Sequence, residues 1–266
     1  MVPVEGPRYD RMELTLLSVE ALHHAYAPGQ TAIGDVSFNV RAGEIVSIVG
    51  PSGCGKTTLL KALAGLVAPT GGEIRFQGKP VRGVPPGLAM VFQEYSRSLF
   101  AWTTVRANVE LPLRYKPIDA AQRTARVSES LEALGLAGFE DRYPWQLSGG
   151  MQQRVAIARA LAYQPKLLLM DEPFASVDAQ TRTDLEDLAA AVRDRFDITI
   201  VLVTHDIDEA VYLSDRVVVM SAAPSTVLAQ ISINLPRPRD QIATKACEQF
   251  VVRRSEVAQL IRRRSG

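Results

Sequence analysis

The most constraining feature of this sequence is a glycine-rich loop set between an apolar run and a helical pattern. The loop consists of Gly50, Pro51, Ser52, Gly53, Cys54, Gly55, Lys56, Thr57 and Thr58. It follows the apolar residues 45–49 and precedes residues 59–64, so the expected order is buried strand, loop and helix. A phosphate-binding loop of the form G-x-x-x-x-G-K-S/T requires that order. Because glycines let backbone N–H groups approach an anion and a helix N-terminus favours negative charge, the stretch predicts a nucleotide-phosphate site.

Two side chains of the loop carry the expected chemistry. Lys56 can reach the β- and γ-phosphates of a nucleotide, and the hydroxyl of Thr57 is placed to hold Mg²⁺. The alternative is a chance match, which occurs in roughly one chain in a hundred of this length. The strand and helix that flank the loop make a chance match rarer still.

Length and composition narrow the class of protein. At 266 residues the chain can bury a substantial core, and its 30 Lys and Arg against 29 Asp and Glu give no charge excess that would favour nucleic acid or anionic lipid. Its two cysteines, Cys54 and Cys247, favour reduced thiols over a disulfide framework. No apolar run approaches the roughly eighteen residues that span a bilayer, and the N-terminus lacks a signal-peptide core. We expect a soluble intracellular protein unless a partner brings it to a membrane.

Strand and helix patterns alternate through the rest of the chain. Apolar runs predict strands at residues 73–76, 88–92, 166–171, 198–204 and 217–220, with helices between most of them. This alternation is typical of a mainly parallel α/β sheet. Residues 94 to about 161 are too long for one crossover and predict an inserted helical lobe. Within that lobe, Asp119 is available as a helix cap.

A second glycine-containing stretch precedes another helical pattern. It runs Leu147, Ser148, Gly149, Gly150, Met151, Gln152, Gln153 and Arg154. A serine and bare amides at a helix N-terminus again suit an anion, although a stretch like this on its own favours an ordinary capping turn. It does not stand alone, because Asp171 and Glu172 end one apolar run further on, Asp178 follows, and His205 ends the next run.

In this order the features resemble the ATP-binding subunits of ABC transporters, over nearly the whole chain. The matching elements are the phosphate loop, Gln93, the signature LSGGMQQ at residues 147–153, the run LLLMDE at 167–172, Asp178 and His205. The resemblance implies a P-loop NTPase core with a mainly parallel sheet, an N-terminal antiparallel β subdomain and an inserted α-helical lobe. We expect the ATPase domain at residues 13–250, its lobe at about 94–161, and a basic C-terminal helix or tail at 251–266.

The resemblance also implies roles in Mg²⁺-dependent ATP hydrolysis. Thr57, Gln93 and Asp171 would hold Mg²⁺. Glu172, next to the metal carboxylate, would orient or deprotonate the attacking water, while Lys56 binds phosphate. His205 would contact the γ-phosphate. A single histidine at a strand end is more often structural, and only its place in this series favours the functional role.

Further residues are assigned to nucleotide and dimer contacts by the same likeness. Tyr26 lies where the family has an aromatic residue that stacks on adenine, the alternative being a half-buried strand tyrosine. His23 and His24 have no such support and are interpreted as surface residues. The signature residues Ser148, Gly149 and Gly150 would close over the γ-phosphate held by a second copy of the chain. Two shared sites would then form in a head-to-tail dimer, with Asp178 in the segment that crosses it.

The branch of the family is suggested by two stretches. Residues 93–102 and 235–240 resemble the nitrate, sulfonate and taurine importers, although Ala101 stands where a proline is usual. Residues 175–178, Ala-Ser-Val-Asp, also depart from the commoner Ser-Ala-Leu-Asp. A single site-bearing domain without a membrane span implies a separate permease, and indirectly an extracytoplasmic solute-binding protein. The expected location is the cytoplasmic face of the inner membrane, and the expected cargo a small anion.

Several alternatives stay open. A soluble ABC-type ATPase acting on nucleic acid or ribosomes is disfavoured by the single phosphate loop and the lack of heptads, and we expect no nucleic-acid partner; an exporter subunit is a further possibility. The apolar residues Tyr95, Leu99, Phe100 and Trp102 either pack under the lobe or dock the permease. The basic residues near the C-terminus form either a solvated helix face or a contact with anionic lipid. They are Arg253, Arg254, Arg262, Arg263 and Arg264.

Overall fold

A ten-stranded sheet organises the computed structural model, which describes residues 14–262; the expected lead-in at 1–12 and Arg263 and Arg264 lie outside this range. The strand order is β5-β4-β1-β2-β10-β9-β3-β8-β7-β6. The strands are β1 (Thr15–Ala25), β2 (Thr31–Arg41), β3 (Ile45–Val49), β4 (Gly71–Phe76), β5 (Lys79–Pro80), β6 (Leu88–Val91), β7 (Leu167–Asp171), β8 (Thr199–Val203), β9 (Arg216–Met220) and β10 (Ser225–Ser232). The mixed α/β fold predicted from the sequence is confirmed.

The parallel half of the sheet runs from β9 through β3, β8 and β7 to β6. Every residue of β3, β7 and β8 is buried, as expected where both faces of a parallel sheet are covered. Alternate residues of β3 enter separate cores: Ile45 and Val49 face one, Val46 and Ile48 the other. The antiparallel half pairs β1 with β2 and β4, and β10 joins the halves by pairing with both β2 and β9.

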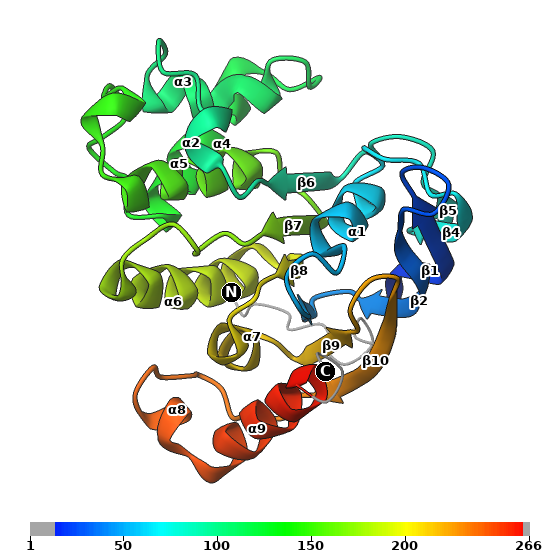
Figure 1. The fold of residues 1–266 in the computed structure, drawn as a ribbon. Coiled ribbons are helices and arrows are strands. Elements are labelled where there is room, and N and C mark those ends of the chain that lie inside the picture. The colour runs from blue at the N-terminus through cyan, green and yellow to red at the C-terminus, as the bar shows by residue number, and fades with distance from the viewer. Residues whose placement is uncertain (1–13, 263–266) are drawn as a thin grey trace.

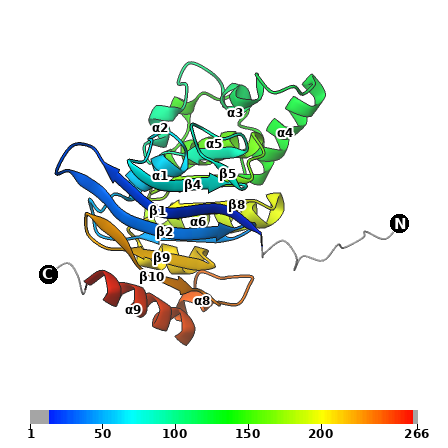
Figure 2. The same ribbon diagram turned by 90° about the vertical axis from the view of Figure 1, so that its right-hand side faces the viewer.

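Helices cover both faces of the sheet (Figures 1 and 2). They are α1 (Lys56–Leu63), α6 (Ala179–Phe196), α7 (Ile207–Leu213) and α9 (Glu248–Arg262), while the short helix α8 (Ala243–Ala246) precedes α9 and has no buried residue. Buried residues of α1 share a core with β1, β2 and β4. Those of α6, α7 and α9 share the opposite core with the helical lobe. The phosphate loop therefore begins a helix that is packed on one side of the sheet only.

The helical lobe projects beyond β6, at the end of the molecule opposite α9 (Figures 1 and 2). It contains α2 (Tyr95–Ser98), α3 (Val105–Glu110), α4 (Ala120–Ala133) and α5 (Gly149–Ala162), with short 3₁₀ turns at Leu111–Leu113 and Pro144–Gln146. Asp119 caps α4 as predicted, because its carboxylate accepts a hydrogen bond from the Gln122 amide at 2.7 Å.

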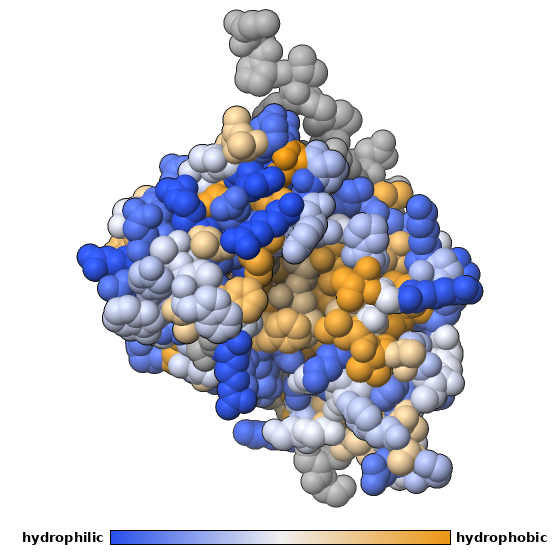
Figure 3. All heavy atoms as spheres, turned by 90° about the horizontal axis from the view of Figure 1, so that it is seen from above, coloured by the Kyte–Doolittle hydropathy of each residue, from blue (hydrophilic) through white to orange (hydrophobic). Residues whose placement is uncertain are grey.

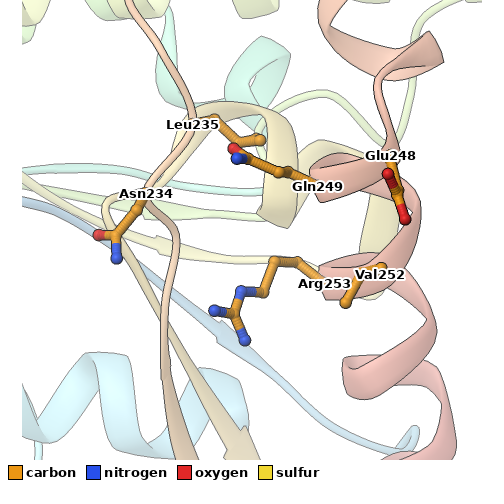
Figure 4. Close-up of a pocket in the computed structure, with 6 residues that line it drawn as sticks. All are labelled: Asn234, Leu235, Glu248, Gln249, Val252 and Arg253. Carbon is orange, nitrogen blue, oxygen red and sulfur yellow. The ribbon is translucent and has the colours of Figure 1, made fainter.

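The C-terminal helix begins earlier than the sequence suggested. The expected domain boundary between residues 250 and 251 falls inside α9, whose Phe250 and Val257 are buried. Arg253 pairs with Glu256 at 2.7 Å and Arg254 with Asp208 at 2.5 Å. A pocket of about 400 Å³ separates the start of α9 from the segment after β10 (Figure 4); it is lined by Asn234, Leu235, Glu248, Gln249, Val252 and Arg253. No helix within residues 14–262 is both long and apolar enough to cross a membrane.

Candidate functional site

The phosphate loop closes around the ammonium group of Lys56. Lys56 is the first residue of α1, and its Nζ donates to the carbonyl oxygens of Gly50 at 2.9 Å and Pro51 at 3.0 Å. Gly55, the residue before the helix, has φ of 93°, a conformation that glycine adopts without strain. At Gly50 a Cβ atom would lie 2.9 Å from the Sγ atom of Cys54, so only glycine fits. The glycines and the hydrogen bonds of Lys56 thus define the shape of the loop.

Thr57 and Asp171 meet beside the loop. Thr57, in the first turn of α1, donates its hydroxyl to Oδ1 of Asp171 at 3.1 Å, and Asp171 is the buried last residue of β7. Burial raises the pKa of the Asp171 carboxyl above its ordinary value, and the hydrogen bond from Thr57 opposes part of that rise. A hydroxyl and a carboxylate are both oxygen ligands of the kind that Mg²⁺ prefers.

Two expected site residues, Gln93 and His205, converge on the carboxylate of a third, Glu172. Nδ1 of His205 lies 3.0 Å from Oε2 of Glu172, so the imidazole donates to it, and Nε2 of Gln93 donates to the same oxygen at 3.4 Å. Gln93 follows β6, Glu172 follows β7 and His205 follows β8, three strands that are neighbours in the parallel sheet. Their carboxyl ends meet at one edge, which is where open α/β sheets place their ligands.

Glu172 has an unusual backbone conformation. Its φ is +43°, in the left-handed region that non-glycine residues rarely adopt. The amide of Glu172 donates to the carbonyl oxygen of Val203 at 2.8 Å, which holds this turn against the end of β8. Strain of this kind persists where surrounding contacts fix the chain. Here it turns the carboxylate toward Gln93 and His205.

His24 lies near the end of β1, and Tyr26 lies in the turn that follows the strand. The Tyr26 side chain is 63% exposed, and its hydroxyl lies 2.7 Å from Oγ1 of Thr58, in the first turn of α1. The interpretation of His24 as a surface residue is wrong, since only 6% of it is exposed. Consecutive strand residues face opposite sides, so His23 points to solvent while His24 faces the core. Only the path of β1 against the loop after α1, where Ala68 accepts from His24, reveals this burial.

The signature stretch forms the N-terminus of α5. The hydroxyl of Ser148 accepts a hydrogen bond from the Met151 amide at 3.3 Å, which makes Ser148 the N-cap. A Cβ atom on Gly150 would lie 2.4 Å from Cγ2 of Thr181, so α5 and the first turn of α6 approach as closely as glycine allows. Thr181 also donates its amide and its hydroxyl to Asp178, the N-cap of α6, at 3.0 and 2.7 Å.

The two hydrogen bonds from Thr181 hold the pKa of the exposed Asp178 carboxyl below its ordinary value. Ser148 accepts its hydrogen bond within α5 and Gly150 lies against α6, whereas the hydrogen-bond partners of Lys56 belong to the phosphate loop itself. Two groups of expected site residues therefore exist, one at the sheet edge and one at the α5–α6 contact. Thr181 contacts Gly150 of the signature and donates hydrogen bonds to Asp178, so it links the two. Thr181 was missed in the sequence, although its place three residues after a capping aspartate was an available signal.

Comparison with known proteins identifies the family. Residues 33–175 match the ABC transporter family. An uncharacterized ABC transporter ATP-binding protein of Methanocaldococcus jannaschii is 46% identical over 217 residues, covering 82% of this chain and 80% of that protein. The chain belongs to the ABC transporter family. It is an ATP-binding ATPase of that family.

Other relatives of this ABC transporter ATPase carry names that state a transported solute. The nitrate import ATP-binding protein NrtD of Synechocystis is 45% identical, covering 77% of this chain and 76% of that one. The taurine import ATP-binding protein TauB of Yersinia pestis is 40% identical, covering 91% of this chain and 95% of that one.

Solved structures of relatives share the fold. The CbiO1 protein of Clostridium perfringens, described as part of the transporter complex CbiONQ, superposes with a TM-score of 0.76 at 30% identity, over 82% of this chain and 88% of that one. The ATP-binding cassette MJ0796, solved as a dimer bound to ADP and Pi, superposes with a TM-score of 0.71 at 32% identity, over 82% of this chain and 99% of that one.

The apolar residues after Gln93 were expected either to pack under the lobe or to dock a permease, and the structure divides them into a buried and an exposed group. Tyr95 and Leu99 are buried in the lobe, which agrees with packing. Trp102 is 76% exposed, and its ring lies 5.1 Å from that of the half-buried Phe100. Asn108 fixes the backbone between them, accepting from the Phe100 amide at 2.8 Å and donating to the Phe100 carbonyl at 3.1 Å. This ABC ATPase thus presents an exposed tryptophan on a well-anchored loop.

Proposed function

We propose that this ABC transporter ATPase hydrolyses Mg²⁺-ATP and thereby energises the import of a small anionic solute through a separate permease. The observation that carries the proposal is the meeting of Gln93, Glu172 and His205 at the carboxyl ends of three adjacent parallel strands. Thr57 and Asp171 lie in contact at the same edge, one residue from the shared carboxylate. Phosphoryl transfer to water needs positioned groups and charge stabilisation, which such a cluster supplies.

In the proposed mechanism the phosphate loop and Lys56 bind the phosphates of ATP. The N–H groups at the start of α1 and the ammonium group of Lys56 together suit the triphosphate. Mg²⁺, when bound, would neutralise charge on the phosphates. Thr57, Gln93 and Asp171 supply oxygen atoms for it, and Mg²⁺ usually takes one or two carboxylates and completes its shell with phosphates and water. Among the described residues, no group of three or more His, Cys, Asp or Glu side chains is arranged to hold a metal ion by itself, and this mode of binding requires none.

In the proposed mechanism Glu172 acts on the attacking water molecule. Its carboxylate can orient a water molecule or accept its proton, and both neighbours restrict where it points. His205 shares the proton on its Nδ1 with that carboxylate, so its Nε2 is left for the γ-phosphate region. Gln93 ties the same carboxylate to the lobe, because α2 begins two residues after it.

The second copy of the chain is proposed as a partner on the basis of the signature. Ser148, Gly149 and Gly150 form a helix N-terminus whose neighbours lie in α5, α2 and α6, and none of the contacts given for them is with the phosphate loop of the same chain. A helix N-terminus favours a phosphate, so the signature suits one supplied by another copy. The dimeric MJ0796 cassette with ADP and Pi supports this arrangement, with Asp178 near the crossing.

The importer assignment rests on named relatives and on one face of the molecule. The nitrate and taurine import proteins support a small anion as cargo. Figure 3, which views the molecule from above, shows apolar side chains gathered in a hollow beside the helical lobe. An apolar surface of this kind suits a permease segment. The ATPase would then act at the cytoplasmic face of the inner membrane, and the solute would reach the permease from a binding protein outside.

The test of the proposed chemistry is Glu172→Gln. Glutamine keeps the shape of the side chain but removes the charge that orients water, so Mg²⁺-ATP binding should persist while steady-state turnover falls at least about a hundredfold. Size-exclusion chromatography with Mg²⁺-ATP should show the variant as a dimer. Glu129→Gln, the same change at an exposed site on α4, is the control and should keep wild-type turnover. Turnover within a few-fold of wild type in Glu172→Gln would show that the role is misassigned.

A further inference from the structure

His24 is a buried histidine that the proposed chemistry does not use. It lies near the end of β1, with 6% of its surface exposed. Its Nδ1 is 3.2 Å from the carbonyl oxygen of Ala68, so this nitrogen carries the proton and donates it. Its Nε2 is buried without a hydrogen-bond partner in the described part of the chain. An unpartnered buried nitrogen lowers stability, so an apolar side chain would suit the core better unless the ring has another task.

The ring of His24 packs against Tyr26. The two ring centroids are 4.8 Å apart and the ring planes are at 89°, the edge-to-face arrangement that aromatic pairs prefer. The hydroxyl of Tyr26 lies 2.7 Å from Oγ1 of Thr58. The tyrosine ring is thus fixed at two points while 63% of the side chain stays exposed. An exposed aromatic ring held this firmly is a platform for a flat ligand.

Both supports of Tyr26 lead back to the helix of the phosphate loop. Thr58 lies in the first turn of α1, and Ala68, which anchors His24, follows the end of that helix. The turn that carries Tyr26 is closed by a hydrogen bond from the Tyr26 amide to the Gln30 carbonyl at 3.1 Å. The platform is therefore set at a fixed distance from the phosphate loop, and a ligand that spans both meets a preorganised site.

We infer that His24 is a positioning residue for nucleotide binding: it holds the Tyr26 ring in place to stack on the base while the loop binds the triphosphate. The inference rests on the proposed stacking of adenine on Tyr26. It predicts that the two parts of the nucleotide respond differently to changes at His24. ATP contains both parts, whereas inorganic tripolyphosphate carries the phosphates without a base.

A reciprocal pair of variants separates the ring of His24 from its hydrogen bond. His24→Gln keeps a donor for the Ala68 carbonyl and removes the ring, whereas His24→Phe keeps a ring against Tyr26 and removes the donor. We expect His24→Gln to weaken Mg²⁺-ATP binding by about three- to tenfold, as loss of one aromatic contact implies, with tripolyphosphate affinity within twofold of wild type. His24→Phe should bind both ligands as wild type does. Isothermal titration calorimetry on the full chain measures both affinities.

Controls distinguish the inference from its premise. His23→Gln, the same change at the exposed neighbour, should leave both affinities unchanged. Tyr26→Ala should weaken ATP alone, and adding His24→Gln to it should cause no further loss. Equal weakening of ATP and tripolyphosphate by His24→Gln, no weakening of either, or full additivity with Tyr26→Ala would overturn the role of His24. If Tyr26→Ala itself leaves ATP affinity unchanged, the proposed stacking fails instead, while the test of hydrolysis through Glu172 stands apart.

Discussion

At the scale of single residues, this ABC ATPase combines strained and buried groups near its site. Glu172 has a left-handed backbone, and Asp171 is buried with a raised pKa. Glu209 of α7, four residues after His205, is buried, and one of its carboxylate oxygens has no hydrogen-bond partner in the described range. Its pKa lies well above the ordinary value because burial disfavours the charged form and Glu186 and Asp206 add negative charge nearby.

A stability prediction follows for Glu209. A raised pKa in the folded state means that the folded protein binds its proton more tightly than the unfolded chain, so stability is fully present at low pH and falls as the pH rises through the folded pKa. Glutamine mimics the protonated carboxyl and never ionises. Glu209→Gln should therefore match wild type in urea unfolding near pH 4 and become progressively more stable than wild type toward pH 8. A difference that shrinks as the pH rises would contradict the assignment.

At the scale of elements, the contact between α5 and α6 joins the signature to the segment around Asp178. Gly150 packs on Cγ2 of Thr181, and Thr181 is held by Asp178 through its amide and hydroxyl. Because Gly150 brings α5 directly against Thr181 of α6, a shift of either helix would move both the signature and the segment around Asp178, the two proposed dimer contacts. The arrangement suits two helix N-termini that have to meet another copy of the chain together.

Gly150→Ala tests that contact. The added methyl group would lie 2.4 Å from Cγ2 of Thr181, so the helices must separate, at a cost of about 1–3 kcal/mol in the free energy of unfolding. Thr181→Ser removes Cγ2 and keeps the hydroxyl that bonds to Asp178, so the double variant should recover most of the loss. Urea unfolding of the two single variants and the double variant measures this coupling. Equal unfolding free energies for Gly150→Ala and the double variant would show that the contact is not the cause.

At the scale of the whole molecule, the sheet carries the lobe at its β6 end, and α9 lies at the opposite end of the molecule (Figure 1). Gln93 is the link between edge and lobe, since its side chain reaches Glu172 and its chain continues directly into α2. Under the proposed function, the hydrogen bond from Gln93 is the route by which a change at Glu172 on hydrolysis would reach the lobe loop that presents Trp102. This is the physical basis for expecting coupling to a permease on that side.

Trp102→Glu tests docking on the lobe. Because Trp102 is largely exposed, its replacement should leave the melting temperature and basal ATPase near wild type. A charge at a buried interface should cost roughly 2 kcal/mol or more of binding, so the variant should no longer co-purify with the permease. Tyr115→Glu, at another exposed aromatic residue of the lobe, is the control and should still co-purify. A melting temperature lowered by many degrees, or loss of the permease in both variants, would contradict docking through Trp102.

The sequence alone determined the phosphate loop, most strands of the parallel half of the sheet, the inserted lobe and the capping residues Asp119 and Ser148, because these depend on local patterns of apolar, glycine and capping residues. It did not predict β10, which joins the two halves of the sheet. Only the tertiary structure decided which side chains from distant segments come into contact. Gln93, Glu172 and His205 are far apart in sequence and share one carboxylate only because β6, β7 and β8 lie side by side. The burial of His24, the split between Leu99 and Trp102 and the early start of α9 likewise depend on packing between distant segments. Short-range sequence patterns indicate which face of a helix or strand is apolar, but the segment that covers that face is determined only when the sheet and helices are assembled.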